Sequence, residues 1–222
     1  MSFKHLMHIG MIFVTLLLTA NVIGEKPVSF GLIVLPAGVL LFPLTYLLGD
    51  IITEVYGFRE ARRIIWFGMI CNLFMAFMCR LAILAPSPDS WLHQEAYTQI
   101  LGNGSRLMAV STLTYFICEF MNAYIVAKLK VKMRGRAFWL RSLCGSWIGE
   151  GIETALFLPL AFYGIMSNDE LLKFGLFYYS FKVVYAFCTV PLANKLVNIL
   201  KRREKIDQYD QLSDFSLLKP TY

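Results

Sequence analysis

The sequence predicts an all-α fold: a polytopic integral membrane bundle of about six transmembrane helices, with both termini in the cytoplasm. Of the 222 residues, 57% are hydrophobic and only 16% are charged, whereas a soluble domain is roughly a quarter charged. The apolar residues gather in stretches of roughly 17 to 25 residues or more, the length an α-helix needs to cross the hydrocarbon core. Basic residues at the ends of these stretches predict the orientation.

Six apolar stretches are long enough to be spans. The first follows Lys4 and resembles a signal peptide, but no small-residue cleavage site with a polar mature domain follows, so we expect a retained span. Pro43, Pro159 and Pro191 lie within later stretches, where we expect kinks or tilt. The expected spans are 6–24, 30–56, 64–84, 107–128, 138–163 and 171–200.

Basic residues collect in every second connection, which the positive-inside rule places in the cytoplasm. The longest outer connection, 85–104, contains prolines and a tryptophan, and we expect a short interfacial helix over 91–101. We expect one transmembrane domain over 1–203 and a polar, poorly ordered cytoplasmic tail over 204–222. The basic residues of the cytoplasmic connections are Arg59, Arg62, Arg63, Lys128, Lys130, Lys132, Arg134, Arg136, Arg141, Lys201, Arg202, Arg203 and Lys205.

Several classes of function are disfavoured by composition. Histidines occur only at positions 5, 8 and 93, around the start of the first expected span and in the outer connection, so neither a serine–histidine pair nor an HExxH metal site is available deep within the membrane. There is no Walker A motif, so we do not expect the chain to hydrolyse ATP. The five cysteines form no CxxC pair and are typical of small buried hydrophobic residues. We therefore do not expect this chain to be an enzyme, to carry a cofactor or to contain a metal site. The net charge of +6 is explained by the flanks of the spans, and we expect no nucleic-acid partner.

A weak internal similarity links the second and fourth expected spans. Leu-Thr-Tyr at 44–46 precedes Asp50 by the same spacing at which Leu-Thr-Tyr at 113–115 precedes Glu119. A basic connection, a tryptophan and a cysteine five residues later follow in both places. Either these few matches arise by chance, or the chain contains a parallel repeat of a two-helix unit.

Ionisable residues inside the expected spans are the strongest functional signal. Asp50 and Glu54 lie four residues apart, on one face of a helix. A carboxylate in lipid costs at least a few kcal/mol, so it is expected to face the bundle interior or a polar cavity. The deep acids outnumber the deep cations, so some should be protonated, bind a cation, or contact donor groups of a substrate.

The expected site combines these groups with nearby polar side chains near mid-bilayer, where transporters place their substrates. Alternatives stay open: the deep groups could be structural pairs, Glu54 could be a solvated helix-end carboxylate near Arg59, and Arg80 could reach the outer interface. The expected substrate-binding residues are Tyr46, Asp50, Tyr115, Glu119, Asn122, Glu150, Glu153 and Lys182, and the expected gating or coupling residues are Asp50, Glu54 and Arg80.

Three stretches resemble the queuosine precursor transporter family, which is also described as a vitamin uptake family. They are FPLTYLLGDIITEVYGFREARRIIW, SRLMAVSTLTYFICEFMNAYIVAKLK and SLCGSWIGEGIETALFLPLAFYG, with Lys182 in a matching YYSFKVVY segment. The resemblance runs from about residue 21 to 202 and implies a six-span, multi-pass protein of the bacterial inner membrane. It implies import of 7-deazaguanine precursors of queuosine, such as 7-cyano- or 7-aminomethyl-7-deazaguanine. Family members carry polar residues of varying type where Glu119, Glu150 and Glu153 stand, so which carboxylates are essential is left open.

These observations favour a membrane transporter whose partners are a small deazapurine and the lipid bilayer. We expect Glu150 and Glu153 to contact the purine-like edge, Asp50 to gate or to couple a proton, and Lys182 to act as counter-ion or hydrogen-bond donor. Two alternatives remain: a substrate-binding subunit of a vitamin-type uptake complex energised by a separate ATPase, and a non-transporting membrane scaffold. The sequence leaves open the preferred precursor, the energy source and the oligomeric state.

Overall fold

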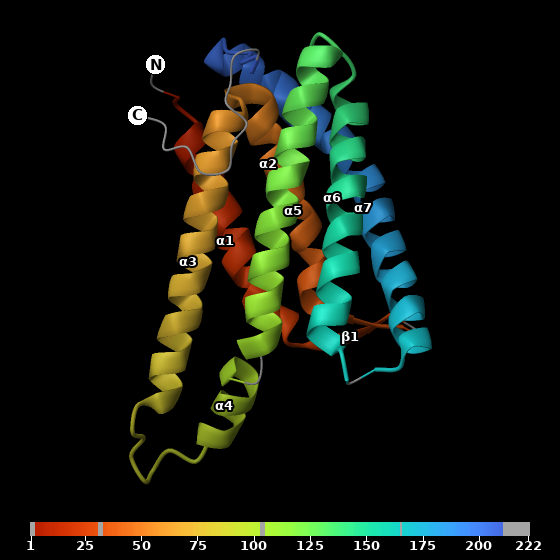
Figure 1. Ribbon diagram of the computed structural model, residues 1–222. Coiled ribbons are helices and arrows are strands. Elements are labelled where there is room, and N and C mark those ends of the chain that lie inside the picture. The colour runs from red at the N-terminus through yellow and green to blue at the C-terminus, as the bar shows by residue number, and fades with distance from the viewer. Residues whose placement is uncertain (1–2, 31–32, 103–104, 165, 211–222) are drawn as a thin grey trace.

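The computed structural model describes residues 3–30, 33–102, 105–164 and 166–210. Long helices run side by side in the bundle, and α4 is a short helix beside one end of it (Figure 1). The elements in these residues are α1 (Leu6–Gly24), β1 (Pro27–Phe30), β2 (Ile33–Pro36), a 3₁₀ turn η1 (Ala37–Leu40), α2 (Phe42–Tyr56), α3 (Phe58–Leu84), α4 (Gln94–Gly102), α5 (Ser105–Lys132), α6 (Phe138–Phe162) and α7 (Asn168–Glu204).

The helical membrane bundle predicted from the sequence is confirmed. Within the described residues, five helical segments are long and apolar enough to cross a membrane: 6–24, 37–56, 58–84, 109–132 and 168–204. The sixth long helix, α6, has 25 residues and packs between α5 and α7. It carries Arg141, Glu150 and Glu153, which lower its apolarity. Its polar residues are thus placed inside the bundle rather than toward lipid.

Helix α2 is the centre of the bundle. It contacts α1, α3, α5, α6 and α7, and twelve of its fifteen residues are buried. In contrast, α3 lies at the edge of the bundle and exposes Phe67, Phe74 and Phe77, as expected for a surface that faces lipid. Polar side chains on α2 are therefore shielded from lipid by its neighbours.

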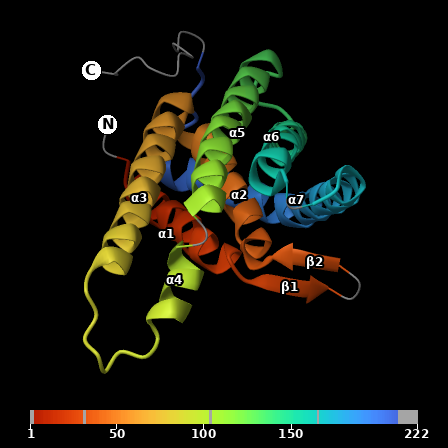
Figure 2. The same cartoon turned by 60° about the horizontal axis from the view of Figure 1, so that its bottom comes forward.

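The predicted start of the second span, at residue 30, is wrong. Residues 27–36 form an antiparallel hairpin in which Pro27 pairs with Pro36, and the backbone N–H of Ala37 donates to the carbonyl of Lys26 at 2.8 Å. Proline disrupts a helix interior but is favoured in its first turn, so Pro36 ends the extended segment and Pro43 sits at the start of α2. Figure 2 shows the hairpin and α4 at the same end of the bundle.

The turn between α2 and α3 is much tighter than the sequence predicts. Gly57 alone separates the two helices, with φ of +87°, a conformation that residues with a Cβ rarely adopt. Helix α3 therefore starts at Phe58, and the arginines expected in a connection lie in its first turns. The outer connection contains the expected short helix, which starts at Gln94 rather than at Trp91.

The start of α1 and the end of α7 meet at the basic end of the bundle, which the positive-inside rule makes cytoplasmic. The carboxylate of Glu204, the last residue of α7, accepts hydrogen bonds from the backbone N–H groups of Lys4 and His5, at 3.2 and 2.7 Å. It also accepts one from the hydroxyl of Tyr56, at 3.2 Å. The start of α1 and the ends of α2 and α7 are thereby joined.

Two glycines let α6 approach α5 closely. Gly145 and Gly149 lie one turn apart, and a Cβ at Gly145 would overlap the side-chain oxygen of Asn122. A Cβ at Gly149 would lie 3.2 Å from the carbonyl oxygen of Cys118. Small residues at this spacing are typical of tightly packed membrane helices. The close contact brings the polar side chains of α5 and α6 together beside α2.

Candidate substrate-binding site

Five ionisable residues from four helices are buried in the centre of the bundle, and we call them the central polar cluster. They are Asp50 on α2, Glu119 on α5, Glu150 and Glu153 on α6, and Lys182 on α7, and each is at most 6% exposed. The sequence predicted that these residues converge. Whether they bind substrate stays a prediction.

Asp50 is held by two neutral donors. Asn122 on α5 donates its side-chain N–H to Oδ1 at 2.7 Å, and the hydroxyl of Ser142 on α6 donates to Oδ2. Each carboxylate oxygen thus has a partner on a different helix. Ser142 was not among the predicted site residues, because a serine near the start of a span has no distinctive sequence signal.

Glu119 has a different environment. Its carboxylate lies against the backbone of α2 at Gly49, where a Cβ would overlap Oε1. Neither oxygen makes a hydrogen bond to any described residue, although the side chain is 0% exposed. Buried polar atoms normally have partners, so this carboxyl group is unusual.

Within the described residues, the central polar cluster contains one ion pair, and Lys182 forms it. Its ammonium group donates to the carboxylate of Glu153 and lies 4.3 Å from the centre of the Tyr178 ring. Glu150, one turn from Glu153 on α6, has one carboxylate oxygen, Oε2, without a hydrogen bond in the described residues. The side with Lys182 therefore offers both a charged pair and an unsatisfied acceptor.

Tyr46 and Tyr115, which occupy matching positions in the proposed repeat, are in contact. Their ring centres are 5.7 Å apart in an edge-to-face arrangement, and both side chains are buried. This contact is compatible with two related halves that meet at the central polar cluster. The repeat itself stays a prediction.

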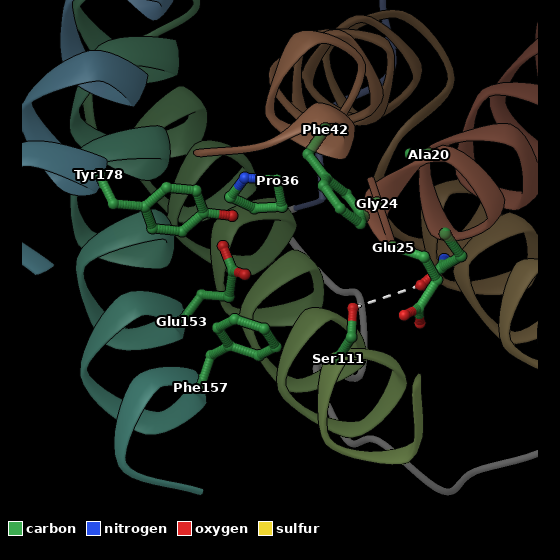
Figure 3. Close-up of a pocket in the computed structure, with 10 residues that line it drawn as sticks. Ala20, Gly24, Glu25, Pro36, Phe42, Ser111, Glu153, Phe157 and Tyr178 are labelled. Atoms are coloured by element: carbon green, nitrogen blue, oxygen red, sulfur yellow. Dashed lines mark hydrogen bonds between the residues drawn. The ribbon is translucent and has the colours of Figure 1, made fainter. Parts of the chain in front are cut away.

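A small pocket reaches the central polar cluster from the end of the bundle that carries the hairpin (Figure 3). Glu153, Phe157 and Tyr178 form one wall, and Pro36 and Phe42 form another. On a further side, the hydroxyl of Ser111 donates to the side-chain oxygen of Asn21 at 3.3 Å. The cavity volume of about 40 Å³ is enough for one or two water molecules. A purine-sized molecule needs the walls to separate.

The polar groups are arranged by depth along α6. Arg141 and Ser142 lie near its cytoplasmic start, Glu150 and Glu153 follow, and Phe157 lies at the outer pocket. At about 1.5 Å per residue, Ser142 and Glu153 are separated by about 16 Å. The outer pocket, the central polar cluster and the cytoplasmic end therefore follow one another through the bundle.

Glu54 belongs to a separate ion-pair network at the cytoplasmic end. Its carboxylate is 0% exposed and lies 2.5 Å from Arg141, 2.5 Å from Lys201 and 3.8 Å from Lys130. The partners come from α6, α7 and α5, not from the nearby Arg59 that the sequence suggested. Glu54 therefore joins four helices. Arg80, which was also predicted to be a gating residue, is exposed on α3 and is not part of the buried central polar cluster.

The beginning of the C-terminal tail packs onto this network. Lys130 donates to the Asp207 carboxylate at 2.5 Å and to the Gln208 carbonyl at 2.7 Å. Asp210 accepts from the backbone N–H of Phe58 at 2.9 Å, which satisfies a free donor at the start of α3. Up to Asp210, therefore, the expectation of a poorly ordered tail is wrong. Residues 211–222 lie outside the described residues.

Asp207 stays charged at neutral pH. Burial raises its pKa, but hydrogen bonds and charges from Lys130 and Lys201 outweigh this and leave the pKa below its ordinary value of 3.8. A carboxyl group whose pKa is lower in the folded state stabilises the fold at every pH above its unfolded-state pKa. This stabilisation is lost as the pH falls through the folded-state pKa. The stability that Asp207 contributes to the contact of the tail with the bundle should therefore be constant between about pH 6 and 8.

Replacing Asp207 with asparagine is expected to release the tail without unfolding the bundle. Because Asp207 is 41% exposed, the expected loss of stability is below about 1 kcal/mol. Trypsin cleavage at Lys205 in the purified protein should accelerate several-fold, at any pH between about 6 and 8. Asp89→Asn, at an exposed position in the outer connection, is the control. Equal cleavage rates in both variants would contradict the role of Asp207.

An all-α bundle with buried ionisable groups behind a pocket is typical of polytopic membrane transporters. The family described as "Putative vitamin uptake transporter" matches residues 36–195, which is more than half of the chain. The chain belongs to this family and is a multi-pass protein of the bacterial inner membrane.

Curated relatives cover most of the chain. It is 23% identical over 187 residues to the "Probable queuosine precursor transporter" of Bacillus subtilis (strain 168), covering 84% of this chain and 82% of the relative. It is 22% identical over 205 residues to the "Queuosine precursor transporter" of Escherichia coli (strain K12), covering 90% of each chain. A relative in Haemophilus influenzae is 22% identical over 172 residues, which is 75% of this chain and 70% of the relative. No solved structure matches the chain significantly.

Proposed function

We propose that this protein imports queuosine precursors, 7-cyano-7-deazaguanine, 7-aminomethyl-7-deazaguanine or a related deazapurine, into the cytoplasm. The observation that carries the proposal is the central polar cluster, in which Glu153 lines the outer pocket and pairs with Lys182, and Glu150 offers an unsatisfied acceptor one helical turn away. The names of the relatives supply the substrate class.

The chemistry of these residues suits a guanine-like molecule. Its edge presents adjacent N–H donors, which a carboxylate accepts well, and its carbonyl oxygen accepts from an ammonium group. Glu150 has a free acceptor, and Lys182 could exchange part of its contact with Glu153 for one with the substrate. Phe157 lines the pocket and offers a ring on which a flat heterocycle can pack. Tyr178 also lines the pocket, but its ring is stacked on Phe174 and contacted by Lys182.

The two ends of the bundle suggest how access alternates. On the outer side, a pocket of about 40 Å³ has to widen to admit substrate. On the cytoplasmic side, the Glu54 network and the tail hold four helices together. We propose that substrate first enters beside Glu153, and that separation of the cytoplasmic network then releases it inward. In this scheme Asp50, held by Asn122 and Ser142, keeps α2, α5 and α6 together at the level between the two gates.

The decisive experiment uses bacteria that can neither make these precursors nor import them. Expression of this chain should restore queuosine in tRNA at low external precursor, and Glu95→Gln, an exposed change on α4, should behave like the natural chain. No restoration with the protein present in the membrane would contradict import by this chain alone. Uptake by purified protein in liposomes would exclude dependence on a separate ATPase.

A further inference from the structure

Glu119 is the acid of the central polar cluster that has both carboxylate oxygens buried and without a donor in the described residues, whereas Glu150 has one such oxygen, Oε2. Asp50 has Asn122 and Ser142, and Glu153 has Lys182. Both oxygens of Glu119 are without a hydrogen bond in the described residues, and the side chain is 0% exposed. An ionised carboxylate without donors or a counter-ion is strongly unfavourable in such a place, and binding a proton removes most of that cost.

The groups that face Glu119 offer no positive charge. The charged groups that act on Glu119 are Asp50 on α2 and Glu150 on α6, and both are acidic. The hydroxyls of Tyr46 on α2 and Tyr115 on α5 are the nearby weak acids. Lys182 on α7, the cation of the cluster, is paired with Glu153. Within the described residues, no three acidic, histidine or cysteine side chains could hold a metal ion. A proton is therefore the cation that fits.

The position of Glu119 suits a site that is accessible in turn from the outer side and from the cytoplasmic side of the membrane. It lies against Gly49, next to Asp50, which is one helical turn from Glu54 in the cytoplasmic network. The substrate pocket touches Glu153, farther toward the outer side. Water admitted by opening of either gate can reach Glu119, whereas the closed arrangement isolates it.

We infer that Glu119 is the proton-binding site of the transport cycle, so that one proton enters the cytoplasm with each deazapurine. This inference rests on the proposed function. A proton from external water forms the carboxyl O–H bond of Glu119 in the outward-open state. The bond breaks when the cytoplasmic gate opens, and the proton passes to cytoplasmic water. Asp50, which the sequence favoured for coupling, keeps its hydrogen bonds to Asn122 and Ser142 and holds the helices.

The test uses purified full-length protein in liposomes with labelled 7-cyano-7-deazaguanine, an uncharged probe, and the membrane potential clamped at zero. For one proton per substrate, the natural chain should accumulate the probe up to about tenfold for each unit of inward pH difference. A protonophore should abolish this gradient. Exchange of internal for external probe should continue without any pH difference.

Glu119→Gln imitates the protonated side chain and is the informative variant. Its accumulation ratio should fall to about one, while exchange persists at a reduced rate that no longer changes with pH. Glu95→Gln, exposed on α4, should accumulate like the natural chain. Accumulation by Glu119→Gln under the pH difference would overturn the inference, as would loss of its exchange when the protein is folded, because Glu119 would then serve substrate binding.

The assay also separates this inference from the proposed function. Absence of any exchange by the natural chain would contradict deazapurine transport itself. Exchange by the natural chain without accumulation under a pH difference would leave the proposed function intact and overturn proton coupling at Glu119.

Discussion

Replacing Glu54 with glutamine is expected to lower the free energy of unfolding by about 3–5 kcal/mol, because it leaves a buried cation without its counter-charge. Arg141 is 0% exposed, and its guanidinium lies 2.5 Å from the Glu54 carboxylate. The carbonyl oxygens of Arg136 and Gly135 accept from the same side chain but do not neutralise it. Denaturant unfolding of the purified protein in detergent micelles measures the change.

Two further variants sharpen this prediction. Glu60→Gln removes a carboxylate that pairs with Arg63 on the surface of α3, and its expected effect is below about 1 kcal/mol. Glu54→Gln combined with Arg141→Met removes both buried charges and should recover part of the stability. If Glu54→Gln and Glu60→Gln unfold alike, the network contributes little to the fold.

We expect Glu153→Gln and Lys182→Gln each to destabilise the protein when made alone, and the two changes to compensate partly for each other when they are combined. Each single change leaves a buried charge with its partner removed, so each should destabilise the protein by several kcal/mol. The double variant should fold better than either single variant. Its uptake should nevertheless be about 10- to 100-fold slower at low substrate, because charge-assisted hydrogen bonds to substrate are lost.

Stability and uptake must therefore be measured on the same protein samples. The matched control is Glu95→Gln with Lys173→Gln, which removes one acid and one base from exposed positions on the outer side. A double variant that recovers both folding and uptake would show that the Glu153–Lys182 pair is structural only.

The sequence predicted the bundle well where apolar length and basic flanks were the signal. It failed at the start of the second span, because Val28, Val34 and Leu35 are as apolar in a hairpin as in a helix. The length of a run of hydrophobic residues does not distinguish the two structures, and Pro36 was the local sign of the change.

For the site, the deep acids could be identified because a charge in an apolar stretch is conspicuous. Their partners could not, because pairing depends on which helices pack together. Asp50 and Ser142 are 92 residues apart, and Glu54 and Lys201 are 147 apart. Arg141 was counted among the basic residues of a connection, although it lies in the first turn of α6 and is fully buried.

The Glu54 network also bears on how the protein is made. Glu54 leaves the ribosome before all three of its cationic partners, which follow on α5, α6 and α7. While the chain is being inserted, α2 carries an uncompensated carboxylate and cannot be stably exposed to lipid. Its final burial has to await the last helix. Chains that stop before Lys201 should therefore be incompletely assembled and open to removal by membrane proteases.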